Sequence, residues 1–279
     1  MSATQPNDLV EAVIAEATML QKFLTELDEP IWKGDSTSDG WTIEDVVAHL
    51  AGSAAGWANN IARAIADDPS PPEGQSFLPH GARASHPSGP SARESRQKSA
   101  PQLLDDFIAG HEHLKRVLAT LSGEDWEKPC FHRRGVQPVK SYLGIQLQEL
   151  ALHGWDIRWG LDDKAELRPG SLAALVELVP RWIGIAFAPG LDLLSPVRYR
   201  FDVSNPVTIY EDLLITGDAY RTKIPTTEHA DATFQSNTSN YILLMFGRLQ
   251  VDRAVADRRL SVEGSMKRAN EFNAWFKGF

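Results

Sequence analysis

Cysteine and long apolar runs are both scarce in this chain of 279 residues. The only cysteine, Cys130, has no partner for an intramolecular disulfide, which excludes a disulfide-stapled secreted scaffold. No apolar run approaches the roughly 20 residues that a membrane-spanning helix requires. Residues Met1–Asp8 lack the basic and then apolar pattern of a signal peptide. We therefore expect a cytoplasmic protein that does not enter a membrane.

Basic residues are also in short supply. The 28 Lys and Arg residues face 37 Asp and Glu residues, which leaves a net charge of −9. Such a chain is poorly suited to bind nucleic acid, because phosphates must be neutralised by clustered basic side chains. Hydrophobic residues make up 42% of the chain and charged residues 23%, a composition typical of a globular protein with a substantial core.

The first half of the chain has the periodicity of amphipathic helices. Apolar residues recur at spacings of three and four, as in Val10, Val13, Ala17, Leu20 and Leu24. Four such segments predict a four-helix bundle. They cover residues 7–28, 42–67, 99–121 and 140–160.

The helix ends carry recognisable signals. We expect Asn7 or Asp8 to cap the first helix and Pro30 to end it. Thr42 is expected to cap the second helix, with acidic residues in its first turn.

Residues 69–98, between the second and third helices, are rich in Pro, Ser and Gly. This segment is too long for an ordinary connection between helices, so we expect either a mobile flap or a segment that wraps the bundle. His80 and His86 lie in it, and we expect no function for them.

The second half of the chain has a different pattern. Residues 171–187 predict one more apolar helix, broken near Pro180. Beyond it, alternating polar and apolar residues predict strands, and two further segments predict helices. The strands are expected at 197–203, 207–210, 230–234 and 260–262, and the helices at 239–248 and 265–276. We therefore expect a helical domain over residues 1–168 and an α+β domain over residues 169–279.

A polar stripe in the fourth helix is the most informative pattern. Gln146, Glu149, His153 and Asp156 follow one another at spacings of three, four and three, and leucines and tryptophans surround them. Glu149 and His153 stand at i and i+4, so their side chains can bind one divalent metal. The alternative is an exposed Glu–His pair without a metal.

His49 offers a third ligand. It lies in an apolar stretch of the second helix and is followed by Gly52, Ser53 and Gly56. Each mid-helix glycine costs about 1 kcal/mol relative to alanine, a cost that is understandable if space beside His49 must stay open. The alternative is a core histidine bonded to a carbonyl, with the glycines allowing close helix packing. Two imidazoles and one carboxylate with an open coordination position are typical of a catalytic zinc site.

Two motifs resemble the mycothiol-dependent maleylpyruvate isomerase family: WTIEDVVAHL at 41–50 and QELALHGWDI at 148–157. The segment YILLMFGR at 241–248 resembles, more loosely, the sterol-carrier-like domain of many members. The resemblance implies a DinB-like bundle that holds Zn²⁺ or another divalent metal through His49, Glu149 and His153, followed by a sterol-carrier-like α+β domain. It also implies that Arg248 contributes to activity.

The resemblance further implies chemistry that uses mycothiol or a similar low-molecular-weight thiol. A zinc-bound thiol is present as thiolate at neutral pH, so the protein needs no nucleophilic cysteine of its own. The thiolate would serve a cis–trans isomerase of the maleylpyruvate type, acting on a small unsaturated acid, or an S-transferase, acting on an electrophile. Arg248 would hold a substrate carboxylate or bond the carbonyls at a helix end. Asp156 would orient a ligand histidine, pair with Arg158 or cap a turn, and Gln146 and Ser53 would line the pocket.

Two other functions stay open. A metal-dependent hydrolase on the same bundle would need a general base, for which Asp156 and Asp45 are candidates. A lipid- or small-molecule-binding protein would use the second domain alone. The sequence does not indicate an oligomeric state.

Three other groups of residues attract attention but are expected to have no catalytic role. We expect the surface of the third helix to carry His111, Glu112 and His113 in contact with solvent. Cys130 is expected to be half-buried and inert, not a nucleophile. Arg133 and Arg134 form a small basic group, which either meets an anionic ligand or belongs to a solvated loop.

Overall fold

The computed structural model describes residues 5–38, 40–79, 97–190 and 192–277. The chain divides into two compact units, one running to Ala165 and the other starting at Glu166. Within the described residues, no helix is long and apolar enough to cross a membrane.

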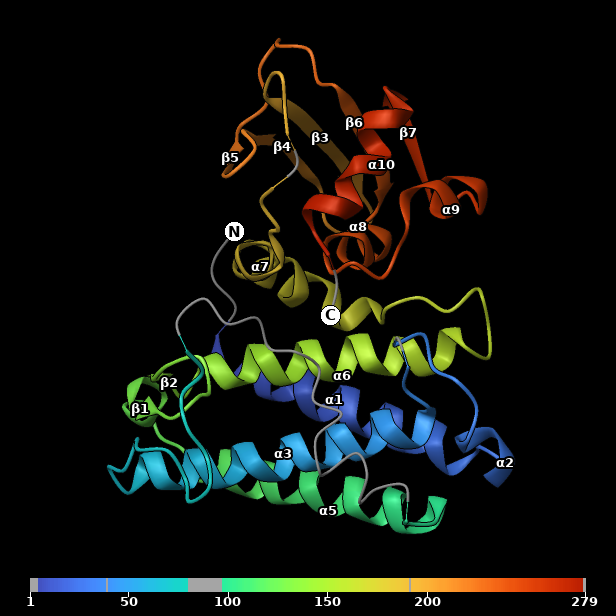
Figure 1. Ribbon diagram of the computed structural model, residues 1–279. Helices are drawn as coiled ribbons and strands as arrows, with labels where there is room; N and C mark the ends of the chain where they lie inside the picture. The colour runs from blue at the N-terminus through green and yellow to red at the C-terminus, as the bar shows by residue number, and fades with distance from the viewer. Residues whose placement is uncertain (1–4, 39, 80–96, 191, 278–279) are drawn as a thin grey trace. The chain divides into compact units, whose positions relative to one another are not determined.

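The first unit is a four-helix bundle, as predicted (Figure 1). Its helices are α1 (Pro6–Thr25), α3 (Ile43–Ile65), α5 (Ala100–Leu118) and α6 (Ser141–Trp159). Contacts run from α1 to α5, from α5 to α3, from α3 to α6 and from α6 back to α1, which closes the ring. Because α6 buries apolar and polar side chains all round, polar residues of this helix lie inside the protein.

Shorter elements connect the four helices. The one-turn helix α2 (Glu29–Trp32) precedes α3. Between α5 and α6 lie the 3-10 helix η1 (Asp125–Glu127) and a small hairpin of β1 (Pro129–Cys130) and β2 (Gln137–Pro138). Contacts between β1 and α3 place this hairpin against the second long helix.

The ends of α3 and α1 differ in how well local signals predicted them. At α3, Thr42 Oγ1 accepts a hydrogen bond from the Asp45 amide at 3.3 Å, and Asp45 Oδ2 accepts one from the Thr42 amide at 3.1 Å, so the predicted cap is confirmed. At α1 the prediction was wrong. The helix begins with Pro6 after Gln5, where the fixed φ of proline suits the first turn, and Pro30 lies inside the separate helix α2.

The start of the Pro-rich segment runs along the hairpin. The Leu78 amide donates to the Arg133 carbonyl at 2.8 Å, and the rings of Phe77 and Phe131 lie 5.2 Å apart. Phe77 and Leu78 of the segment therefore lie against the hairpin. His80 and His86 lie outside the described residues, and so does the remainder of the segment to residue 96.

The second unit begins with α7 (Pro169–Ala186), which continues through Pro180. The predicted break is wrong. Buried side chains on both sides of the proline, including Val179 and Ile183, hold the helix in place despite the hydrogen bond that proline cannot make.

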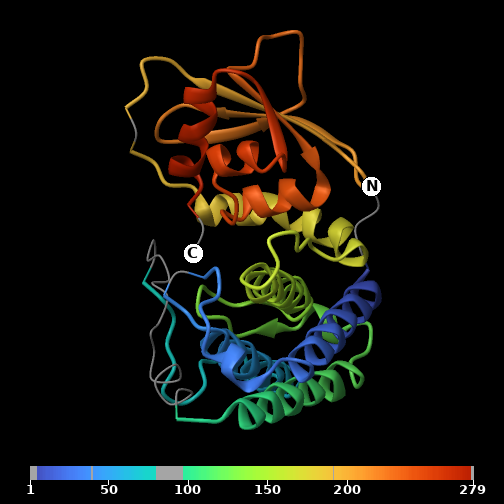
Figure 2. The same ribbon diagram turned by 90° about the vertical axis from the view of Figure 1, so that its right-hand side faces the viewer.

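A five-stranded sheet forms the centre of the second unit (Figure 2). Its strands are β3 (Val197–Ser204), β4 (Ile209–Ile215), β5 (Tyr220–Lys223), β6 (Ala232–Asn237) and β7 (Leu260–Gly264). The order is β5-β4-β3-β6-β7, in which β3 and β6 are parallel and the other neighbours are antiparallel. Side chains of β3 alternate between buried and more exposed, as the sequence predicted, whereas β5 was missed.

Three helices complete this unit: α8 (Thr238–Met245), α9 (Val251–Ala256) and α10 (Met266–Trp275). Phe272 of α10 packs on the sheet, with its ring 5.7 Å from that of Phe201 and 5.4 Å from that of Phe234. The α+β class is therefore confirmed, although α9 was not foreseen.

Candidate metal centre

Three side chains from two helices of the bundle meet at one point. His49 comes from α3, and Glu149 and His153 come from successive turns of α6. Glu149 Oε2 lies 2.9 Å from His49 Nε2 and 3.3 Å from His153 Nε2. The alternative in which His49 is a core histidine bonded to a backbone carbonyl is therefore wrong, because the His49 side chain is 31% exposed and its Nε2 meets a carboxylate of another helix.

The donor set fits a divalent metal. The three candidate ligand atoms all lie within 4.8 Å of one another. Zinc bonds of about 2.0–2.1 Å in a tetrahedron separate neighbouring ligand atoms by roughly 3.3 Å. Two imidazole nitrogens and one carboxylate oxygen are ligands that zinc commonly takes, and three protein ligands leave a fourth position open.

Asp156 supports His153 from behind. Its Oδ2 atom lies 3.0 Å from His153 Nδ1 and accepts a hydrogen bond from Ser38 Oγ at 2.9 Å, while its Oδ1 accepts one from Thr37 Oγ1 at 3.0 Å. The Asp156 side chain is 0% exposed. A carboxylate on Nδ1 keeps the proton on that nitrogen and turns Nε2 toward a metal, the usual arrangement for ligand histidines.

Charge and burial shift two pKa values at this site. Burial raises the pKa of Glu149, but hydrogen bonds from His153 and His49 outweigh it and hold the value well below its usual range. Burial lowers the pKa of His153, but hydrogen bonds to Asp156 and Glu149 outweigh it and raise the value to about 9. The Glu149 carboxylate is thus ionised and held beside a cation, the position that a metal ion would take.

Trp41, just ahead of α3, borders the same site. Its ring centroid lies 5.2 Å from that of His49 and 6.1 Å from that of His153. Thr37, Ser38 and Trp41 were not picked out as site residues from the sequence. Nothing local distinguishes Thr37 and Ser38, because their partner Asp156 is more than a hundred residues away along the chain.

A cavity of about 630 Å³ opens beside His49. Ser53, Gly52 and Gly56 line it along α3, and a Cβ atom added to either glycine would have no neighbour within 4 Å among the residues that the structure describes. The alternative prediction that these glycines allow close helix packing is therefore wrong. Gly110 provides the contrast, because its Cβ would lie 2.8 Å from the Ala51 carbonyl, where α5 packs on α3. The remaining lining residues are Ala48, Trp57, Asn60, Gly74, Gln75, Ser76, Leu78, Phe131, His132, Arg133 and Tyr142.

Gln146 lies in the interior between α6 and α5. It is buried, with its Nε2 atom 3.0 Å from His111 Nε2. His111 is also buried, and its Nδ1 lies 2.8 Å from the Phe107 carbonyl oxygen. The solvated position predicted for His111 is wrong, and burial lowers its pKa. The prediction considered only its spacing from His113 and missed that His111 faces another helix of the bundle.

Arg248 belongs to the second unit. It follows α8, where its amide donates to the Leu243 carbonyl at 2.8 Å and its Nη1 lies 3.5 Å from the Phe246 carbonyl oxygen. Cys130, in the first unit, is fully buried instead of half-buried, and burial raises the pKa of its thiol to about 11. Cys130 is therefore unsuited to act as a nucleophile.

Comparisons with known proteins agree with the division into a helical unit and an α+β unit. Residues 13–158 match the family model described as mycothiol maleylpyruvate isomerase N-terminal domain, and residues 191–277 match the SCP-2 sterol transfer family. No curated protein matches the sequence.

Solved structures of similar fold cover most of the chain. The crystal structure of the mycothiol-dependent maleylpyruvate isomerase is 14% identical, with a TM-score of 0.63, and the match covers 89% of this chain and 93% of that one. A histidine-to-alanine mutant of that isomerase is 13% identical, with a TM-score of 0.65, and the match covers 94% and 96%. YfiT from Bacillus subtilis, described as a probable metal-dependent hydrolase, is 17% identical over 57% of this chain and 87% of its own, with a TM-score of 0.44.

Proposed function

Because the chain belongs to the mycothiol maleylpyruvate isomerase N-terminal domain family, we propose that it is a metal-dependent enzyme that uses a low-molecular-weight thiol such as mycothiol. Its reaction is a cis–trans isomerisation of the maleylpyruvate type or the transfer of the thiol to an electrophile. The proposed partners are the thiol and a small unsaturated or electrophilic acid. The cytoplasm, where such thiols stay reduced, is the proposed location.

One observation carries the proposal: His49, Glu149 and His153 converge from α3 and α6, and His49 also lines a cavity large enough for a small molecule. These three residues would hold Zn²⁺ or another divalent cation. A bound cation would lower the pKa of a coordinated thiol, so that the thiolate is available at neutral pH.

Other residues of the bundle have supporting roles. Asp156 fixes the ring orientation of His153 and keeps the Nδ1 proton in place. Gly52 and Gly56 leave room beside His49 for a ligand. Since the chain's one cysteine is buried, the reactive sulfur has to come from a bound thiol.

The second domain has a separate proposed role. We place it at residues 169–279, from the first residue of α7 onward. We propose that Arg248 binds one carboxylate of the substrate, for which the planar guanidinium is suited. That domain matches the SCP-2 sterol transfer family, which also leaves binding of an apolar ligand as an alternative function.

A hydrolase on the same bundle has less support. It would need a carboxylate able to accept a proton from water. Asp156 accepts hydrogen bonds from Thr37 and Ser38 and contacts His153, and Asp45 is engaged with Thr42 in the cap of α3. Both carboxylates are thus engaged in hydrogen bonds within the protein, which makes them poorly placed to accept a proton from water.

Replacing His49 by alanine tests the proposal. Elemental analysis should find about one metal ion per wild-type chain, and calorimetry should detect saturable mycothiol binding to the metal-loaded protein only. The H49A variant should lose metal, thiol binding and thiol-dependent turnover together. H113A is the matched control, because His113 lies on α5, is hydrogen-bonded to Asn59 and lines no part of the cavity.

Two results would contradict the proposal. If metal-stripped wild-type protein binds mycothiol as tightly as the metal-loaded protein, the metal is not needed to bind the thiol. Normal metal content in H49A would show that His49 is not a ligand. If apolar ligands bind equally well to wild type and H49A and no thiol-dependent activity exists, the carrier alternative replaces the enzyme.

A further inference from the structure

The cavity beside His49 is lined on one side by α3 and on another by the hairpin loop that carries Arg133. Along α3 the lining continues from His49 to Trp57, eight residues later, a distance of about 12 Å along a helix axis. At that level the ring of Tyr142 lies 5.7 Å from that of Trp57 and 5.9 Å from that of His132. The hairpin loop that carries His132 and Arg133 therefore lines the cavity two turns or more away from the metal ligands.

Arg133 is not neutralised by any residue that the structure describes. Its backbone carbonyl is bonded to the Leu78 amide, but its guanidinium forms no ion pair within the described ranges. Neighbouring cations differ in this respect, since Lys128 Nζ lies 3.1 Å from Asp67 Oδ1. Similarly, Lys140 Nζ lies 2.6 Å from Glu127 Oε1. In a chain of net charge −9, an arginine on the cavity wall without an acidic partner among the described residues is a local exception.

Arg134 is the next residue of the loop. Burial and the adjacent charge of Arg133 lower the pKa of its guanidinium. Two like charges on consecutive residues repel each other.

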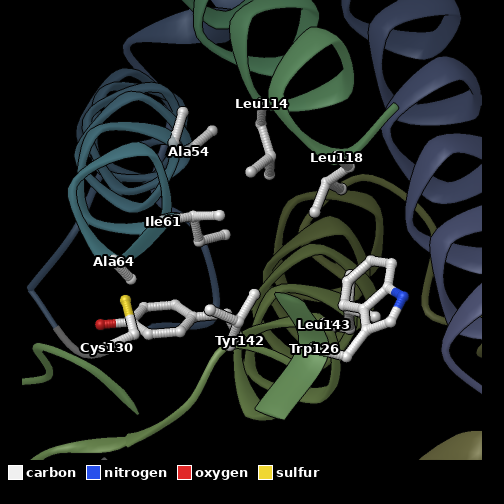
Figure 3. Close-up of a cluster of buried hydrophobic side chains, with 11 residues drawn as sticks. Ala54, Ile61, Ala64, Leu114, Leu118, Trp126, Cys130, Tyr142 and Leu143 are labelled. Carbon is white, nitrogen blue, oxygen red and sulfur yellow. The ribbon is translucent and has the colours of Figure 1, made fainter. Parts of the chain in front are cut away.

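The loop is anchored firmly. Cys130, which immediately precedes it in β1, points into a buried cluster with Ala64 and Tyr142 (Figure 3). The Tyr142 hydroxyl donates a hydrogen bond to the Phe131 carbonyl. The residues just before Arg133, Cys130 and Phe131, are buried and hold the loop backbone in place. A fixed backbone gives a binding side chain a defined position.

We propose that Arg133 forms an anion subsite, which takes a carboxylate of a ligand whose other end reaches the metal centre. A guanidinium binds a carboxylate through two parallel hydrogen bonds, and Asn60, Gln75 and Ser76 add polar groups along the way. The carboxylate belongs to the acid substrate or, if the thiol is one that carries a free carboxylate as glutathione does and mycothiol does not, to the thiol. The ligand's identity rests on the proposed function, whereas recognition of the carboxylate by Arg133 does not require the metal.

The test compares acids with their neutral esters. Calorimetry would measure the affinity of metal-loaded protein for maleate and dimethyl maleate, and for glutathione and its diethyl ester. The proteins are wild type, R133A, R133K and R116A. Arg116 is the matched control, because it is an exposed arginine of the same bundle, on α5, that lines no part of the cavity.

Wild type should bind at least one acid about tenfold more tightly than its ester, the usual size of a charge-assisted contact. R133A should abolish this preference and leave ester binding unchanged, R133K should keep part of it, and R116A should keep all of it. A preference confined to maleate assigns the carboxylate to the substrate, and one confined to glutathione assigns it to the thiol.

The subsite is refuted if wild type does not distinguish acid from ester, or if R133A keeps the preference. Repeating the titrations on metal-stripped protein separates the two proposals. An acid preference that persists there and depends on Arg133, in a protein without thiol-dependent turnover, would refute the proposed function and leave the subsite standing.

Discussion

Replacing Asp156 by asparagine should weaken metal binding without unfolding the bundle. Asp156 is fully buried, and its two oxygens contact Thr37, Ser38 and His153 at 2.9–3.0 Å. Asparagine has nearly the same shape and can still accept a hydrogen bond from His153. It lacks the negative charge that makes His153 a stronger ligand, and its NH₂ group cannot accept from a hydroxyl.

The expected loss in metal affinity is about 10- to 100-fold, the range typical when a group behind a ligand is changed. This corresponds to about 1.4–2.8 kcal/mol. Competition with a chromophoric chelator at fixed pH gives the dissociation constant for Zn²⁺, and circular dichroism establishes that the helices persist. The matched control is D106N, because Asp106 is half-exposed on α5 and pairs with Lys98 far from these ligands in sequence.

A dissociation constant for D156N within about threefold of wild type, in a folded protein, would refute the reasoning. It would mean that the 3.0 Å contact between His153 Nδ1 and Asp156 Oδ2 does not contribute to the ligand strength of His153. An equal loss in D106N would point to a general effect of charge and would likewise exclude the specific role of Asp156.

Two further predictions concern pH and the glycines of α3. Because the pKa of His153 is raised to about 9, a metal must displace its Nε2 proton at lower pH. Zinc affinity should therefore rise about tenfold per pH unit from pH 7 toward 9 and then level off. Competition with a chelator across this pH range measures the affinity. A flat profile would show that His153 is neutral in the metal-free protein. In urea unfolding, G56A should be stabilised by up to about 1 kcal/mol, because alanine favours helix and its Cβ meets open space. G110A should instead be destabilised, because its Cβ would lie 2.8 Å from a carbonyl oxygen, and equal effects in the two variants would contradict this account.

Some sequence predictions failed where tertiary packing or an alternative local signal outweighed the pattern used. Pro180 was expected to break a helix, but buried side chains on both sides keep α7 continuous. His111 was expected on a solvated face, yet it is buried against Gln146 of another helix. The start of α1 was misplaced because Pro6 was not weighed as a first helical residue.

Local pattern was sufficient for the four long helices, for the alternating strand β3 and for the placement of Glu149 and His153 on one helix face. These features depend on backbone periodicity, which acts over a few residues. The glycines after His49 also predicted open space beside it from the sequence alone, because a glycine has no side chain to fill that space.

The remaining features depend on how helices and loops pack, and periodicity contains no information on that. His49 and Glu149 are a hundred residues apart and meet only because α3 and α6 are neighbours in the bundle. The same packing brings Thr37 and Ser38 to the carboxylate of Asp156 and sets Arg133 on the wall of the cavity that His49 also lines. The chain thus encodes its candidate ligands locally, whereas their convergence, support and surroundings arise from long-range contacts.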